Sequence, residues 1–336
     1  MAGTNRQWIL ASRPTGEPTM DDFELRESAV PEPGHGEVLV KSRYLSVDPY
    51  MRGRMRDAES YAEPWDVGDV MQAGVVGDVV ESNHPDFEEG DVATGNLRWA
   101  EYAVADGDDL QPVDPDLAPI STALGVLGMP GRTAYFGTLE VAEPEPGDTL
   151  LVSGAAGAVG SVVGQIGKLA GARVVGIAGA DEKIDWLTEE LGFDAGINYE
   201  ETDDLHAAVG EACPDGVDAY FDNVGGEITD AAFAHLNVRG RVAVCGQISL
   251  YNATEQPMGP RKLPGLIETR ARVQGLLVRD WAGRFDEATE QLAEWVQAGD
   301  VQYRETVTEG FENMPEAFLG LFEGVNIGKQ LVKVAD

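Results

Sequence analysis

The chain contains 336 residues, which is enough for two domains, and 43% of them are hydrophobic, an ordinary value for a globular protein. Acidic residues number 59 against 24 basic ones, so the formal net charge is −35, and such a field repels nucleic-acid phosphates and anionic lipids. The sequence has neither an apolar run of about 18 residues nor a basic-then-apolar leader, so we expect a cytoplasmic protein without nucleic-acid or membrane partners.

Residues 1–127 have the pattern of a β-rich domain. Short or alternating apolar runs occur at residues 37–43, 70–80 and 101–105, and Gly and Pro punctuate the stretches between them. These runs predict strands joined by turns.

Residues 128–299 have a different pattern, in which short apolar runs alternate with helical stretches. One predicted helix continues to residue 170, one spans 181–191 with Asp181 as its cap, and one spans 286–298. This alternation predicts a doubly wound parallel sheet with right-handed crossovers. Two further strands, at residues 301–308 and 330–334, are expected to return the segment 300–336 to the first domain. The predicted strands of the sheet are 149–153, 173–178, 217–221, 241–245 and 273–278.

A glycine-rich turn at residues 150–160 (LLVSGAAGAVG) joins the first of these strands to its helix. This is the position of a dinucleotide-binding turn, in which Gly157 lets the backbone approach a pyrophosphate and Gly160 lets helix and strand pack closely. The helix N-terminus then offers N–H groups to the phosphates. Ala155 replaces the first glycine of the usual pattern, which a tight turn tolerates if the φ angle of Ala155 is negative.

The end of the second strand bears on the choice between NADP and NAD. An NAD site usually places a carboxylate there, whereas here the strand ends in Gly179 and Ala180. Small residues leave room for a 2′-phosphate, with which Lys183 can pair. Alternatively, Asp181 is the NAD carboxylate displaced by two positions, or Lys183 is an ordinary surface charge. Spacing favours NADP and leaves NAD open.

The two cysteines, Cys213 and Cys245, do not form a disulfide framework, and we expect both to be reduced. Two cysteines and four histidines without metal-type spacing provide little for a zinc site. The acidic residues are spread along the chain rather than collected in one tail. This distribution favours a protein adapted to high salt over an ordinary acidic protein, and low salt is then expected to loosen the fold.

Several strings resemble one zinc-free branch of the medium-chain dehydrogenase/reductase family, the branch of leukotriene/prostaglandin reductases and alkenal double-bond reductases. The resemblance covers nearly the whole chain, in order. Besides the turn, the strings are residues 47–55 (VDPYMRGRM), 128–137 (GMPGRTAYFG), 222–226 (DNVGG), 245–252 (CGQISLYN) and 326–329 (NIGK).

The resemblance implies a GroES-like catalytic domain, a Rossmann domain that binds NADPH, and an active site in the cleft between them. It also implies that Lys183 and Tyr199 hold the 2′-phosphate. The stretch 276–278 lacks an aromatic residue that relatives often carry, and residues 68–70 lack the histidine of zinc-dependent members. The cofactor contacts that it implies are Gly157, Ala158, Val159, Gly160, Lys183, Tyr199, Asn223, Cys245, Gly246, Ile248, Ser249, Tyr251, Leu276, Leu277, Val278 and Asn326.

The activity that the resemblance implies is metal-free reduction of a carbon–carbon double bond conjugated to a carbonyl. Negative charge then collects on the carbonyl oxygen, and a neutral phenol is a suitable donor to it. The candidates are Tyr251, our first choice, and Tyr50 and Tyr61 of the first domain, with Met129 at the pocket floor. In the alternative interpretation, Tyr50 and Met129 are packing residues and Tyr61 lies on the rim.

Two other functions remain open. A quinone reductase of the zeta-crystallin type shares the Ala-Ala-x-Gly-x-x-Gly turn, and a catalytically idle NADPH-binding sensor would use the same cofactor site. The strings around Asp48 and Ile248 favour the alkenal/enone reductase over the quinone reductase. The resemblance also implies a homodimer in which the Rossmann sheets pair edge to edge.

Overall fold

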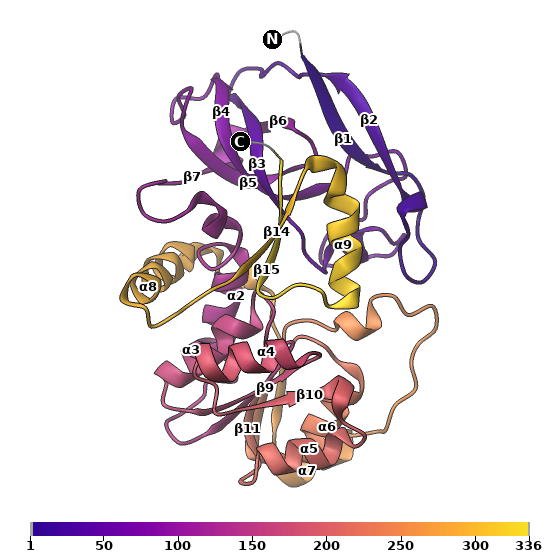
Figure 1. Cartoon of the computed structure of the whole chain (residues 1–336), viewed down its shortest axis with the longest axis vertical. Coiled ribbons are helices and arrows are strands. Elements are labelled where there is room, and N and C mark those ends of the chain that lie inside the picture. Colours follow the sequence, from indigo (N-terminus) through magenta and orange to yellow (C-terminus); the bar gives the residue numbers. More distant parts are fainter. Residues whose placement is uncertain (1–2, 335–336) are drawn as a thin grey trace. The chain divides into compact units, whose positions relative to one another are not determined.

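A computed structural model describes residues 3–334 of the chain (Figure 1). Two compact units are distinguished. One consists of the described residues up to Gly125 together with those from Glu305 onward, and the other runs from Val126 to Arg304. The sequence-based boundaries at 127/128 and 299/300 remain a prediction.

The first unit is built from an antiparallel ribbon and a larger sheet that is antiparallel except where β14 and β15 pair in parallel. β1 and β2 form a two-stranded ribbon, and a seven-stranded sheet has the order β14-β15-β3-β4-β5-β7, with β6 paired to β3. A β-rich domain with turns between short strands was expected. The bounds are β1 (Thr4–Leu10), β2 (Phe23–Ala29), β3 (Glu37–Ser46), α1 (Met51–Arg54), β4 (Gln72–Ser82), β5 (Val92–Arg98), β6 (Tyr102–Asp106), β7 (Gln111–Pro112), β14 (Glu305–Glu309), α9 (Met314–Glu323) and β15 (Lys329–Lys333).

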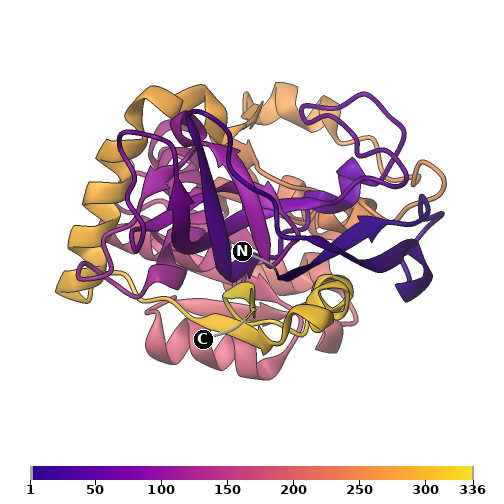
Figure 2. The same cartoon turned by 90° about the horizontal axis from the view of Figure 1, so that it is seen from above.

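In the core of this unit, side chains from the first hundred residues pack against side chains from residues 311–318. Phe23 stacks on Trp99, and the ring of Phe318 on α9 meets both edge-on. The indole nitrogen of Trp8 donates to the carbonyl oxygen of Phe311 over 3.0 Å. α9 therefore packs beside the β1–β2 ribbon, as Figure 1 and Figure 2 both show.

The second unit contains a six-stranded parallel sheet of order β10-β9-β8-β11-β12-β13. The chain starts at β8, moves outward to β10, and then crosses to β11 on the other side. The predicted α/β fold, a doubly wound parallel sheet plus a β-rich domain, is confirmed. The bounds are α2 (Met129–Phe136), β8 (Thr149–Ser153), α3 (Gly160–Leu169), β9 (Arg173–Ala178), α4 (Asp181–Asp185), β10 (Ala195–Asn198), α5 (Leu205–Ala212), β11 (Val217–Asp222), α6 (Gly226–Ala234), β12 (Leu236–Val244), α7 (Leu263–Thr269), β13 (Arg272–Gly275) and α8 (Phe285–Ala298).

Three sequence-based expectations need correction. The helix predicted over 181–191 is α4 followed by a π-helical turn, Trp186–Glu190, in which the Leu191 N–H reaches back to the Trp186 carbonyl. Asp181 does not cap α4, because its carboxylate accepts from the Asn198 side chain at 2.7 Å. The strand predicted over 301–308 starts only at Glu305, since Val301 bonds to Trp295 at the end of α8.

No helix of the described residues 3–334 is long and apolar enough to cross a membrane. Both cysteines are free thiols, as expected. Within the same described range, no cluster of three or more His, Cys, Asp or Glu side chains is arranged to hold a metal ion.

Candidate functional site

The glycine-rich turn leaves β8 and enters α3. The residue with a positive φ angle is Gly154, at +58°, whereas Ala155 does not have one, so the alanine that breaks the usual pattern sits without strain. The Gly157 N–H donates to the Gly154 carbonyl at 3.0 Å and closes the turn. A Cβ atom at Gly160 would lie 2.4 Å from that same carbonyl oxygen, so glycine is required there. No side chain caps the N-terminus of α3, where the helix dipole favours an anion, although the Ser161 and Val162 N–H groups donate to the Gly157 and Val159 carbonyls.

The turn lies where the strand order of the sheet reverses, between β8 and β11. In open parallel sheets a ligand binds in the crevice at the carboxyl ends of the strands at this reversal. The two strand ends are joined by Asn223, whose backbone N–H donates to the Ser153 hydroxyl and whose side-chain amide donates to the Ser153 carbonyl, over 2.9 and 2.8 Å. The predicted cofactor contacts Gly157 and Asn223 thus both flank this reversal.

The end of β9 has the small residues that a 2′-phosphate needs. A Cβ atom at Gly179 would lie 2.7 Å from the Tyr199 hydroxyl oxygen, so this phenol closes over the strand end. Lys183 is half-buried on α4, and burial lowers the pKa of its ammonium group. Asp181 is turned toward Asn198 rather than left available for a ribose. These residues fit a phosphate better than they fit a ribose diol.

The predicted loop 245–251 follows β12 at the same end of the sheet. Its first two N–H groups, from Cys245 and Gly246, donate to the Asp222 carbonyl, and Ser249 donates to the Val224 carbonyl through both its N–H and its hydroxyl. Leu276, which follows β13, lies at the same end of the sheet, since its N–H donates to the Val244 carbonyl. The cofactor candidates of this loop, Ile248 included, therefore follow the carboxyl end of β12, and Leu276, Leu277 and Val278 follow that of β13.

Tyr251 is half-buried in this loop, and its hydroxyl oxygen accepts the Gln247 N–H at 3.3 Å. Burial is the main cause that raises the pKa of the phenol, and Cys245 and Asp222 raise it further. Tyr251 is therefore a neutral donor at neutral pH. Burial also raises the pKa of the Cys245 thiol to about 12, so this thiol is not a nucleophile there.

Two expected pocket residues have contrasting surroundings. Met129 begins α2 in the second unit, and its side chain is 40% exposed rather than enclosed in the core. Tyr50 directly precedes α1 in the first unit and packs partly against that unit's hydrophobic core.

Tyr61 and Asn326 also belong to the first unit. Tyr61 is 56% exposed, and the Asn326 amide donates to the Gly328 carbonyl at 2.8 Å. It remains a prediction that Tyr50, Tyr61 and Asn326 act together with the site residues of the second unit.

Asp222 and Ser153 are site residues that the sequence analysis did not assign. Asp222 was part of a quoted string without a role, and Ser153 was only the last residue of a strand. The signal for both was a polar residue at the carboxyl end of an otherwise apolar strand, the edge at which parallel sheets bind ligands.

The sheet, the turn and the polar strand ends together define a dinucleotide-binding oxidoreductase domain. Two family models match, one described as the N-terminal domain of oxidoreductase over residues 6–113 and one as zinc-binding dehydrogenase over residues 158–297. The chain is 48% identical to the NADPH-dependent curcumin reductase of Escherichia coli, over 98% of this chain and 97% of that protein. It is 44% identical to the NADP(+)-dependent 2-alkenal reductase of Nicotiana tabacum, over 99% and 98%.

The solved structure of CurA from Vibrio vulnificus in complex with NADPH is 45% identical. It superimposes with a TM-score of 0.94 over 98% of this chain and 99% of that one. The chain therefore belongs to the medium-chain dehydrogenase/reductase family, in the branch of prostaglandin, curcumin and alkenal reductases.

Proposed function

We propose that this protein is an NADPH-dependent oxidoreductase that reduces the carbon–carbon double bond of α,β-unsaturated aldehydes and ketones without a metal. The observation that carries the proposal is a neutral, half-buried phenol, Tyr251, on a loop at the carboxyl ends of the strands that flank the dinucleotide-binding turn. The names of the curcumin reductase and 2-alkenal reductase relatives support the substrate class.

The residues of the second unit fit NADPH. The turn around Gly157 and the uncapped N-terminus of α3 suit the pyrophosphate, and Lys183 with Tyr199 suits the 2′-phosphate. The NADPH bound to the CurA relative, at 45% identity, supports the same choice. When bound, NADPH supplies the hydride for the double bond.

The chain's own contribution is to stabilise the charge that develops on the substrate. Hydride addition at the β-carbon moves negative charge onto the carbonyl oxygen, and a donor placed there lowers the barrier. Tyr251 accepts a hydrogen bond from the Gln247 N–H, so its own proton is directed to another partner. In this proposal the Tyr251 hydroxyl donates to the substrate oxygen, and Met129 of the same unit lines the pocket.

The test is NADPH oxidation with a panel of 2-alkenals, enones and quinones, in buffer of molar salt and repeated with NADH. We expect turnover of alkenals and enones with NADPH and much slower turnover with NADH. Turnover of quinones alone would overturn the substrate class in favour of a quinone reductase. Tight NADPH binding without turnover of any electrophile would indicate a binding protein instead.

We further propose a homodimer that works in the cytoplasm on small molecules. β13 is the edge strand of the parallel sheet and all four of its residues are exposed, so its backbone groups are open to a second strand. On α7, which precedes β13 in the chain and packs against β12, Leu263 and Ile267 are 73% and 79% exposed and lie one helical turn apart. An apolar helix face next to an unpaired edge suits pairing with a second copy.

A further inference from the structure

Asp222 is the last residue of β11 and is fully buried, at 0% exposure. Its carboxylate oxygen Oδ1 accepts four hydrogen bonds, and Oδ2 accepts two. The donors to Oδ1 are the hydroxyls of Ser153 and Tyr220 (3.1 and 2.9 Å) and the backbone N–H groups of Val224 and Gly225 (3.1 and 2.9 Å). The donors to Oδ2 are the Thr229 hydroxyl (2.7 Å) and the Gln247 amide (2.6 Å).

This arrangement is that of an ionised carboxylate that is solvated by donors instead of a cation. The two backbone N–H groups can only donate a hydrogen bond, and each of the other contacts is satisfied when Asp222 only accepts. None of the ion pairs among the described residues involves Asp222. The negative charge of a carboxylate in such surroundings acts on neighbouring groups, because no nearby cation neutralises it.

The six donors come from separate segments at the candidate site. The turn after β11 is held through Val224 and through Gly225, whose φ angle is +79°. The loop 245–251 is held through Gln247, and the Asp222 carbonyl also accepts the first two N–H groups of that loop. Gln247 lies so close over Gly225 that a Cβ atom there would be 2.3 Å from its side-chain oxygen.

The loop that Asp222 holds through Gln247 also carries Tyr251, whose hydroxyl oxygen accepts the Gln247 N–H at 3.3 Å. Besides burial, which is the largest cause, the groups that raise the pKa of this phenol are Cys245 and Asp222, and the Gln247 N–H lowers it. The Cys245 thiol is neutral at neutral pH because burial raises its pKa to about 12. Asp222 is therefore the charged group that acts on the phenol.

We infer that Asp222 is a positioning residue that holds the loop 245–251, and with it Gln247 and Tyr251, in its cofactor-binding shape. This inference rests on the proposed function for its catalytic part, but the cofactor part is independent of the substrate. One buried carboxylate thus couples the shape of the cofactor loop to the position of the proposed donor.

Three single variants separate the hydrogen bonds of Asp222 from its charge. Gln247→Leu cuts the side-chain link to the loop and keeps the charge, whereas Asp222→Asn removes the charge as well. Asp218→Asn is the matched control, because Asp218 lies on the same strand about 13 Å from Asp222, given about 3.3 Å per strand residue. There its carboxylate accepts from Thr149 and Asn237.

The first measurement is the NADPH dissociation constant, from nucleotide fluorescence without substrate. We expect about tenfold weaker binding for Gln247→Leu and Asp222→Asn, the effect of losing one charged hydrogen bond, and no change for Asp218→Asn. Wild-type affinity in a folded Asp222→Asn variant would overturn the positioning role. If Asp222→Asn does not fold, Gln247→Leu and Thr229→Val decide, and unchanged NADPH binding in both overturns the proposal.

The second measurement is the ionisation of Tyr251, followed by ultraviolet absorbance as the difference between each protein and its own Tyr251→Phe derivative. The Tyr251 pKa is expected to fall in Asp222→Asn and to stay in Asp218→Asn. Where enone turnover is present, its basic limb should move to lower pH in Asp222→Asn and not in Asp218→Asn. An unshifted Tyr251 pKa in Asp222→Asn refutes the electrostatic role, whereas absence of enone turnover in the wild type refutes the proposed function alone.

Discussion

At the scale of single residues, cofactor choice depends on the end of β9. Gly179 has no side chain, and the hydroxyl of Tyr199 occupies the space that a side chain would take. Asp181 is bonded to Asn198, so a carboxylate is present nearby but is directed away from a ribose-binding position. Under the proposed function, Lys183 is then the residue that pairs with a 2′-phosphate.

The Lys183→Ala variant should lose affinity for NADPH and not for NADH. A charge-assisted hydrogen bond contributes about 1.5–3 kcal/mol, so the NADPH dissociation constant is expected to rise at least about tenfold. Lys168→Ala is the control, because Lys168 on α3 pairs with Asp194 and its loss should leave both affinities unchanged. Equal losses for the two nucleotides in Lys183→Ala would contradict the assignment.

Lys183 also predicts a pH dependence of cofactor binding. Burial lowers the pKa of its ammonium group below the ordinary value for lysine. The charged form holds the phosphate, so NADPH affinity should be full at neutral pH and should fall as pH rises through this lowered pKa. Titration of NADPH and NADH binding against pH checks this, and a parallel loss for both nucleotides would count against it.

At the scale of elements, sequence periodicity predicted the strands of the parallel sheet best where they are buried on both faces. β8 and β9 have the predicted bounds because their apolar runs end at polar residues or glycine. β10 was not predicted, since its four residues include only one strongly apolar side chain, Ile197. The π-helical turn after α4 follows from packing, which buries Trp186 and Leu187, and not from local propensity.

The candidate site was also predicted only in part from the sequence. The turn at residues 154–160 is a local signal, so its place and its glycines followed from the sequence. The role of Asp222 did not follow, because its six donors come from residues 153 to 247 and meet only in the fold. Polar residues that lie far apart in the sequence and meet only in the fold leave no repeating pattern in the sequence that would predict their contact.

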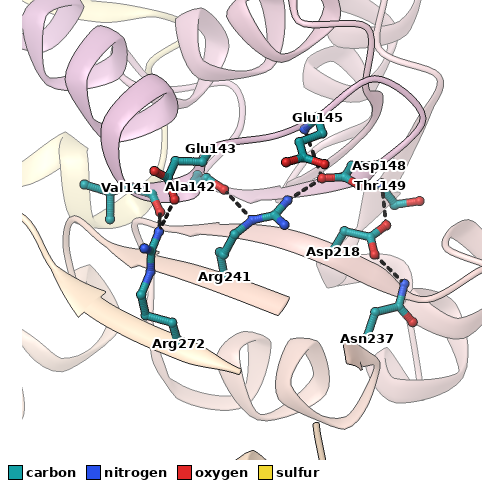
Figure 3. A network of polar contacts seen from close by, with 10 residues as sticks. All are labelled: Val141, Ala142, Glu143, Glu145, Asp148, Thr149, Asp218, Asn237, Arg241 and Arg272. Carbon is teal, nitrogen blue, oxygen red and sulfur yellow. Dashed lines mark hydrogen bonds and ion pairs between the residues drawn. The ribbon is translucent and has the colours of Figure 1, made fainter. Parts of the chain in front are cut away.

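A polar network at the amino-terminal end of the sheet makes a prediction about stability (Figure 3). Arg241 on β12 donates to the Ala142 carbonyl at 3.0 Å and pairs with Asp148, and neighbouring Arg272 on β13 donates to the Val141 carbonyl at 2.8 Å. The two arginines thus tie the end of the π-helical segment 137–142 to the sheet edge. Arg241 and Asp148 are each only 20% exposed, so their pairing is little screened.

Arg241→Met should lower the free energy of unfolding by about 2 kcal/mol, because it leaves Asp148 and a carbonyl oxygen without this donor. The control is Arg261→Met in an exposed loop, for which a change within about 0.5 kcal/mol is expected. Urea titration of both variants by circular dichroism measures the difference. Equal midpoints for the two variants would show that the network does not support the sheet edge.

At the scale of the whole molecule, the exposed edge of β13 predicts a dimer that can be disrupted. A double variant, Ile267→Glu with Val273→Lys, places charges on the apolar helix face and on the edge strand. We expect sedimentation to report a dimer for the wild type and a monomer for this variant. The control Val238→Lys changes another exposed apolar residue, on β12, and should remain dimeric. A wild-type monomer would refute the proposal.

The net charge of −35 predicts that the fold depends on salt. Acidic groups spread over one surface repel one another, and the Debye length falls from about 10 Å at 0.1 M salt to about 3 Å at 1 M. The unfolding temperature should therefore rise by several degrees between these concentrations, at about 1–2 °C per kcal/mol for a chain of 336 residues. Neutralising the exposed pair Glu200 and Glu201 to glutamine should reduce this salt dependence. Calorimetry in sodium chloride and in potassium chloride measures the unfolding temperature. An unfolding temperature that does not change between these salt concentrations would show that the net charge does not destabilise the fold.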